Sequence, residues 1–139
     1  MVDQNNIRGL VQDLSELLDR RMDELRQGSV LGSVRPSDAK VFMLASRKRR
    51  TTAEIARDLG VSKQAVHMSV QRLLEKNVVQ LVPANNSKRD KVIEITPYGH
   101  EIRRLVAEKI AILEAEIDAK IGAEKLAELR HILTALLER

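Results

Sequence analysis

TTAEIARDLGVSKQAVHMSVQRLLEKN, residues 51–77, is the stretch that decides the fold of this chain. Thr51 and Glu54 have the spacing of a capping box, in which the two side chains satisfy free backbone donors reciprocally, so a helix is expected to begin here. Gly60 ends this helix and makes a tight turn. Ser62 then has the character of an N-cap for a second helix. The stretch therefore predicts a helix-turn-helix.

The second helix is expected over residues 63–76, with one side inward and one side outward. Ala56 is small where the two helices would cross. The residues expected to hold the pair together are Ile55, Leu59, Val61, Val66 and Val70. The residues of the second helix expected to face inward are Ala65, Val66, Val70, Leu73 and Leu74. The residues expected to point outward from the first two turns of the second helix are Lys63, Gln64, His67, Met68 and Gln71. Because lysine donates to guanine and glutamine pairs with adenine, this side has the chemistry of a recognition helix in the DNA major groove, and the alternative is an ordinary solvated surface.

A polar and basic hairpin is expected directly after this helix. Asn77 suits a left-handed helix end, and the β-branched residues 78–82 and the alternating residues 91–95 indicate two short strands. The turn between the strands could contact DNA phosphate or the minor groove. Its polar and basic residues are Asn85, Asn86, Lys88, Arg89 and Lys91. The alternative is a hairpin without a binding role. The basic run at residues 47–50 is interpreted as a phosphate clamp, with a solvated loop as its alternative.

Long amphipathic helices are expected at both ends of the chain. One covers Ile7 to Leu25, a short helix follows Pro36, another begins at Thr96-Pro97, and a last one follows Gly122. The terminal helices carry more apolar surface than a small domain can cover. We therefore expect one domain, 1–139, with a winged lobe at 36–100 and a dimerisation region formed by 1–30 and 101–139.

Charge and composition narrow the function. Residues 36–104 carry 14 Lys and Arg against 7 Asp and Glu, whereas both flanking segments are slightly acidic, which favours a polyanion-binding centre. The chain has no Cys, and its three His fall on different helices, so neither a metal site nor a cofactor is expected. No catalytic triad or Gly-rich phosphate loop is visible, which argues against an enzyme. Without a signal peptide or an apolar span, we expect a cytoplasmic protein with no membrane partner.

Residues 59–82, LGVSKQAVHMSVQRLLEKNVVQLV, and residues 86–99, NSKRDKVIEITPYG, resemble the MarR family of winged helix-turn-helix regulators. The resemblance covers nearly the whole chain. It implies an obligate dimer with intertwined terminal helices, which places two recognition helices and two wings on a palindromic site. By this resemblance Arg89 is the wing-tip arginine. Three positions depart from the family pattern, since Ser87 replaces an Asp, Asn77 a Gly and Gln80 an Arg.

The fold expected is mainly α with a small β-hairpin wing, a winged helix-turn-helix with N- and C-terminal dimerisation helices. The function expected is a homodimeric, sequence-specific regulator of transcription, in the form of a repressor of a palindromic operator. An architectural or plasmid-maintenance protein with limited sequence preference is the alternative. The residues expected to contact double-stranded DNA are Thr52, Ser62, Lys63, Gln64, His67, Met68, Gln71, Arg72, Asn86, Ser87, Lys88, Arg89 and Lys91.

The resemblance also implies a small aromatic acid as effector, bound between the winged lobe and the dimerisation helices. The residues considered for this ligand are Phe42, Met43, Tyr98, His100, Arg103 and Arg104. For Phe42 and Met43, packing in the core is the competing interpretation.

Overall fold

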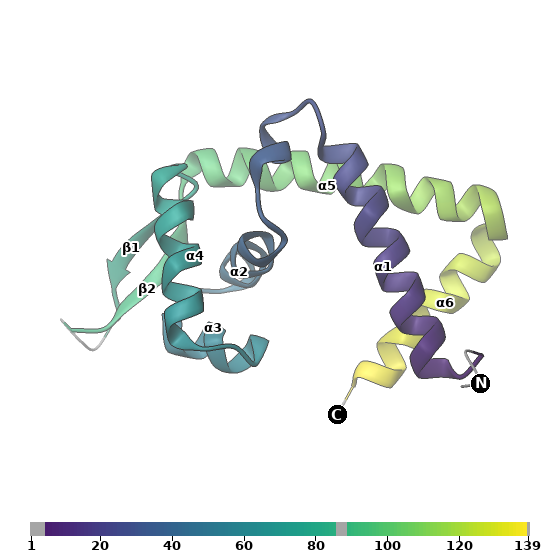
Figure 1. Ribbon diagram of the computed structural model, residues 1–139, viewed down its shortest axis with the longest axis horizontal. Helices are drawn as coiled ribbons and strands as arrows, with labels where there is room; N and C mark the ends of the chain where they lie inside the picture. Colours follow the sequence, from purple (N-terminus) through teal and green to yellow (C-terminus); the bar gives the residue numbers. More distant parts are fainter. Residues whose placement is uncertain (1–4, 86–88, 139) are drawn as a thin grey trace. The chain divides into compact units, whose positions relative to one another are not determined.

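The computed structural model describes residues 5–85 and 89–138, which form a mainly helical chain with one antiparallel hairpin (Figure 1). The elements are α1 (Ile7–Arg26), the 3₁₀ helix η1 (Val30–Ser33), α2 (Pro36–Arg47), α3 (Thr52–Leu59), α4 (Lys63–Glu75), β1 (Val79–Pro83), β2 (Lys91–Ile95), α5 (Pro97–Ile121) and α6 (Ala123–Leu137). The predicted element order is confirmed, and η1 lies where a plain loop was expected. Within the described ranges, no helix has the length and apolarity needed to cross a bilayer.

The chain divides into two compact units. Residues 30–106 form the winged lobe, and residues 1–29 together with 107–139 form the helical unit, so α5 contributes its first part to one and its remainder to the other. The buried apolar core lies in the winged lobe, where α2, α3, α4 and the hairpin pack together. Its most deeply buried large residues include Ile55, Val66, Val70 and Ile93.

Local signals in the sequence set the ends of the helices in the winged lobe. The capping box of α3 is complete, because Thr51 Oγ1 accepts from the Glu54 N–H and the Glu54 carboxylate accepts from the Thr51 N–H. Gly60 has a φ of 68° and Asn77 a φ of 61°, the left-handed conformation predicted at both helix ends. Thr96 Oγ1 accepts from the Gly99 N–H at 2.9 Å and so caps α5.

The hairpin is joined to the rest of the lobe at its root. β1 and β2 pair in register from Val79 with Ile95 to Pro83 with Lys91. The Ile93 N–H donates to the carbonyl oxygen of Arg50 at 2.9 Å, which adds an isolated bridge from the segment before α3 to the outer edge of β2. The wing is therefore attached to the helix-turn-helix on two sides.

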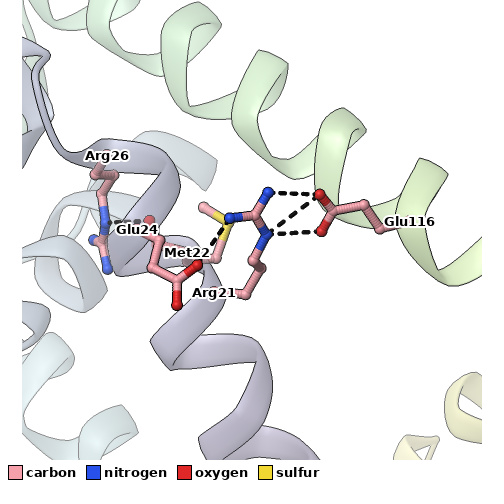
Figure 2. A network of polar contacts seen from close by, with 5 residues as sticks. All are labelled: Arg21, Met22, Glu24, Arg26 and Glu116. Atoms are coloured by element: carbon pink, nitrogen blue, oxygen red, sulfur yellow. Dashed lines mark hydrogen bonds and ion pairs between the residues drawn. The ribbon is translucent and has the colours of Figure 1, made fainter.

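In the helical unit, charged side chains join α1 and α6 to α5, and the described residues form no buried core. Among residues 5–29 and 107–138, none is buried. Arg21 of α1 reaches Glu116 of α5 with two nitrogens, at 2.8 and 2.6 Å, and also donates to Glu24 (Figure 2). Arg130 of α6 forms an ion pair with Glu114 of α5 through one nitrogen, Nη2. Large apolar side chains of α1 and α6 remain exposed, with exposed fractions of 71% for Ile7 and 81% for Leu137.

Candidate nucleic-acid interface

Helix α4 has a buried back and an exposed front. Val66, Val70 and Leu73 are at most 2% exposed and seat the helix in the core. The exposed residues include Lys63, Gln64, His67 and Gln71, which we call the recognition face. These positions are spaced so that they share one side of a helix. The helix thus presents two amide, one imidazole and one ammonium side chain from a rigid base.

The N-terminal ends of α3 and α4 carry two further polar residues that were expected to contact DNA. Ser62 is exposed, and its Oγ accepts from the Ala65 N–H at 3.1 Å, as the predicted N-cap. Thr52 is the first residue of α3 and is half-buried. Helix N-termini carry partial positive charge and favour phosphate oxygens. Ser62 and Thr52 are therefore positioned at ends that suit a phosphate backbone.

The part of the wing that the structure describes adds two cations to the candidate interface. Lys91 and Arg89 are both exposed. Asn86, Ser87 and Lys88, which were expected to contact DNA, lie outside the described residues. At the root of the wing, Gln80 Nε2 donates to Glu94 Oε1 at 2.7 Å, so the position that departs from the family pattern makes a cross-strand bond.

The basic run at residues 47–50 has two exposed residues followed by two that form ion pairs within the lobe. Arg47 and Lys48 are exposed, in keeping with the clamp interpretation. Arg49 forms an ion pair with Glu94 of β2. The side chain of Arg50 is only 11% exposed and meets Asp58 of α3 at 3.2 Å. Its Nε is buried and has no hydrogen-bond partner among the described residues. The second half of the run therefore joins parts of the lobe to one another.

Arg72, expected as a DNA contact, is bound within the lobe. Its Nε donates to Asp38 Oδ2 and its Nη2 to Asp38 Oδ1, both at 2.9 Å. Asp38 is 1% exposed and Ser69, beside it, 3%. Burial works to raise the pKa of Asp38, but the hydrogen bonds from Arg72 and Ser69 outweigh it and the pKa is lowered. The same pairing raises the pKa of Arg72.

Two residues that were predicted to face inward lie at the surface, and that prediction was wrong for them. Val61 is 47% exposed and Ala65 is exposed as well. Both line a cavity of about 400 Å³ beside α2 and α4, together with Met68. The cavity is also lined by three cationic side chains, Arg35, Lys40 and Arg72. Sequence reasoning missed it because apolar residues at helical spacing are normally assigned to the core.

The residues considered for an aromatic effector are placed differently from one another. Phe42 is 5% exposed and belongs to the core, and half-buried Met43 packs against it, in agreement with the competing interpretation. Tyr98, Arg103 and Arg104 are exposed. His100 lines a second cavity, of about 360 Å³, with Lys48 and Arg49. Among the described residues, no group of three His, Asp or Glu side chains is arranged to hold a metal ion.

Three comparisons relate this geometry to known proteins. Residues 41–90 match the sequence profile of the MarR family. An uncharacterised HTH-type transcriptional regulator of Staphylococcus aureus (strain Mu50) is 23% identical over 97 residues, which span 68% of this chain and 66% of the relative. An uncharacterised HTH-type transcriptional regulator of strain N315 shows the same identity and coverage.

Solved structures share the fold over almost the whole chain. The apo form of MarR from E. coli superposes with a TM-score of 0.80 at 21% identity, covering 96% of this chain and 98% of that one. A structure of the Multiple Antibiotic Resistance Repressor, MarR, gives 0.81 at 21% identity, with 96% of each chain covered. The helix-turn-helix, the wing and the profile match over residues 41–90 agree with one another, so this chain has the winged helix-turn-helix fold of MarR, and the central part of its sequence is similar to the MarR family.

Proposed function

We propose that this protein is a homodimeric repressor that binds an inverted-repeat operator in double-stranded DNA. The observation that carries the proposal is the recognition face of α4, a row of exposed base-reading side chains on a helix whose opposite side is seated in the core. Lysine donates to guanine, and glutamine pairs with adenine, in the major groove. Arg89 and Lys91 of the wing supply sequence-independent contacts to phosphate or to the minor groove.

The dimer is supported by the helical unit. No residue in its described part is buried, while Leu14 and Leu17 of α1 and Leu136 and Leu137 of α6 are at least 39% exposed. An exposed apolar surface of this kind is unstable in water and marks an interaction site. A second copy of the chain would cover it with the same residues, as a two-fold interface requires. Two-fold symmetry would place the two half-sites about 10 base pairs apart.

Repression and its relief by a ligand extend this proposal. The direction of regulation is taken from the structural relative that is named a repressor. A small organic acid is the class of effector proposed, because the cavity beside α4 is lined by apolar side chains together with the cations Arg35 and Lys40. A thermal-shift screen with phenolic acids tests this part. No shift of the melting temperature with any of them would remove the effector from the proposal.

The experiment for the main proposal is selection of binding sites from a random duplex pool at one fixed, near-physiological salt concentration. The expected result is an enriched inverted repeat with half-sites about one helical turn apart. The matched control repeats the selection with Lys63→Ala, which should change the enriched bases. Tight binding without any enriched sequence would refute a specific regulator and favour the architectural alternative. Absence of binding to every duplex would refute DNA binding itself.

A further inference from the structure

Asp38 and Arg72 are the most deeply placed ion pair in the winged lobe among the described residues. Asp38 lies in the first turn of α2, and Arg72 lies in the second half of α4, 34 residues later. Two parallel hydrogen bonds of 2.9 Å join them. Arg72 Nη2 also lies 3.4 Å from Ser69 Oγ, one turn earlier on α4. A bidentate arginine-carboxylate pair fixes both the distance and the relative orientation of its two groups.

This directional contact differs from the other contacts that seat α4. Val66 and Val70 hold the helix through apolar burial, which is non-directional and tolerates small rotations or shifts. The bidentate pair tolerates neither, because both oxygens of Asp38 are engaged by one planar guanidinium. A rotation of α4 would move Lys63, Gln64 and His67 together, since they share one side of the helix.

We propose that Asp38 and Arg72 form a latch that sets the rotation and axial position of the recognition helix against α2. In this role both are positioning residues for base readout, and Arg72 does not contact DNA. The inference rests on the proposed DNA binding and deepens it, because it identifies what orients the recognition face. It also replaces the expectation from sequence that Arg72 is itself a DNA contact.

For the effect of Asp38→Asn on DNA affinity, electrostatics alone predicts the opposite direction from the latch. Asp38 is a negative charge in a lobe that must approach a polyanion, so its neutralisation in Asp38→Asn would strengthen DNA binding if charge were its only effect. A latch predicts weaker binding for the same variant, because the recognition face loses its fixed orientation. The exposed Glu101 of α5 is the matched control, since Glu101→Gln removes one negative charge from the same lobe without touching the pair.

Arg72 has an equally sharp test in its conservative variant. If Arg72 contacted a phosphate, Arg72→Lys would keep most of the affinity, because lysine also binds phosphate as a point charge. In the latch, lysine cannot reproduce the two parallel hydrogen bonds to Asp38. If Arg72 contacted a phosphate, Arg72→Gln would also flatten the slope of log affinity against log salt by about one, whereas the latch leaves that slope unchanged.

The experiment measures the affinity of the full-length protein for the duplex selected by the wild type, and for an unrelated duplex, across a salt series. Asp38→Asn and Arg72→Lys are expected to lose about tenfold in affinity for the selected duplex, with a smaller loss on the unrelated one and the wild-type salt slope. The double variant Asp38→Asn with Arg72→Gln should lose no more than either single change, because the two residues act as one unit. Glu101→Gln should bind as tightly as the wild type or slightly more tightly.

Thermal melting of every variant ensures that affinity is compared between folded proteins. If Asp38→Asn does not fold, Arg72→Lys carries the test, because it keeps Asp38 and places an ammonium group, which can still donate to the carboxylate, at position 72. Equal or tighter binding by Asp38→Asn, or full affinity in Arg72→Lys, would overturn the latch while the wild type still binds its site. If the wild type prefers no duplex, the proposed function fails and the latch fails with it.

Discussion

Gly99, in the first turn of α5, lies directly against the main chain of Val78, at the end of the turn that follows α4. A Cβ atom added to Gly99 would overlap the Val78 carbonyl oxygen and would also lie 2.7 Å from Ile95 Cγ2. That carbonyl oxygen already accepts from the Thr96 N–H at 3.1 Å. The close approach joins the start of the wing to the start of α5 and leaves no room for a side chain.

Gly99→Ala is therefore expected to destabilise the winged lobe by about 3 kcal/mol, because main-chain atoms rather than a flexible side chain must move. Gly60→Ala is the matched control. Gly60 has open space around its Cβ position and a φ of 68°, so its substitution should cost only the left-handed strain, about 1 kcal/mol. Chemical denaturation of both variants measures the difference. A smaller loss for Gly99→Ala than for Gly60→Ala would contradict this account.

The capping box at the start of α3 should contribute measurably to stability. Thr51→Ala removes the oxygen that accepts from the Glu54 N–H and is expected to cost about 1 kcal/mol. Thr51→Ser keeps that oxygen and should stay near the wild type. Urea unfolding curves compare the two variants. Equal stability of Thr51→Ala and Thr51→Ser would mean that the box has no energetic role.

Acid should weaken the helical unit through Glu116. The hydrogen bond from Arg21 lowers the pKa of Glu116 below its ordinary value of 4.5. A carboxyl group with a lowered pKa in the folded state stabilises the fold above its ordinary pKa, and this contribution is lost as the pH falls through the lowered value. As the pH is lowered from about 7 to about 3, the melting temperature of Glu116→Gln should fall less steeply than that of the wild type. Glu108→Gln, an exposed position on the same helix, should keep the wild-type pH dependence.

Base contacts and phosphate contacts should respond differently to substitution. Lys63→Ala and Gln64→Ala are each expected to relax the preference for particular bases by about 1–3 kcal/mol. Arg89→Ala should weaken binding to all duplexes to a similar degree and flatten the salt dependence. Competition binding with single-base variants of the selected site separates these effects. Uniform losses on every sequence for all three variants would refute the division of roles.

The apolar face of α6 should control the association state. Leu136→Asp with Leu137→Asp places charges at positions that are 71% and 81% exposed in the single chain, where a dimer would bury them. Sedimentation equilibrium is expected to show a shift from dimer to monomer. His131→Asp adds a charge to the same helix outside the apolar residues and should leave the dimer intact. A dimer that survives the paired leucine changes would place the interface elsewhere.

The local features of the fold could be predicted from sequence because each depends on residues close together in the chain. Thr51 and Glu54 mark a helix start by their spacing, and Gly60 and Asn77 mark helix ends by their tolerance of positive φ. The recognition helix and the hairpin followed from these signals. The concentration of cations in this part of the chain could also be predicted, because the sequence shows a basic centre between two slightly acidic segments.

Contacts between distant parts of the chain could not be predicted in this way. Asp38 reads as an ordinary acid in the first turn of a helix, and nothing near it in the sequence indicates Arg72 as its partner. Arg50 is likewise one of four similar basic residues in the sequence. Only its ion pair with Asp58, which forms in the folded lobe, distinguishes it from Arg47. A charged residue acquires a structural role through tertiary neighbours, so single-sequence reasoning assigns it to the solvent or to DNA.

The bridge between Arg50 and Ile93 has a mechanical consequence. A free two-stranded hairpin bends easily at its base, but here the outer edge of β2 is bonded to the segment that leads into α3, and the side chain of Arg50 meets Asp58 of that same helix. A force applied to the wing, such as a pull from a bound duplex, is therefore transmitted to α3 instead of being absorbed at the strand ends. The wing and the helix-turn-helix should move as one stiff body, and this would convert distortion of the DNA into strain in the lobe.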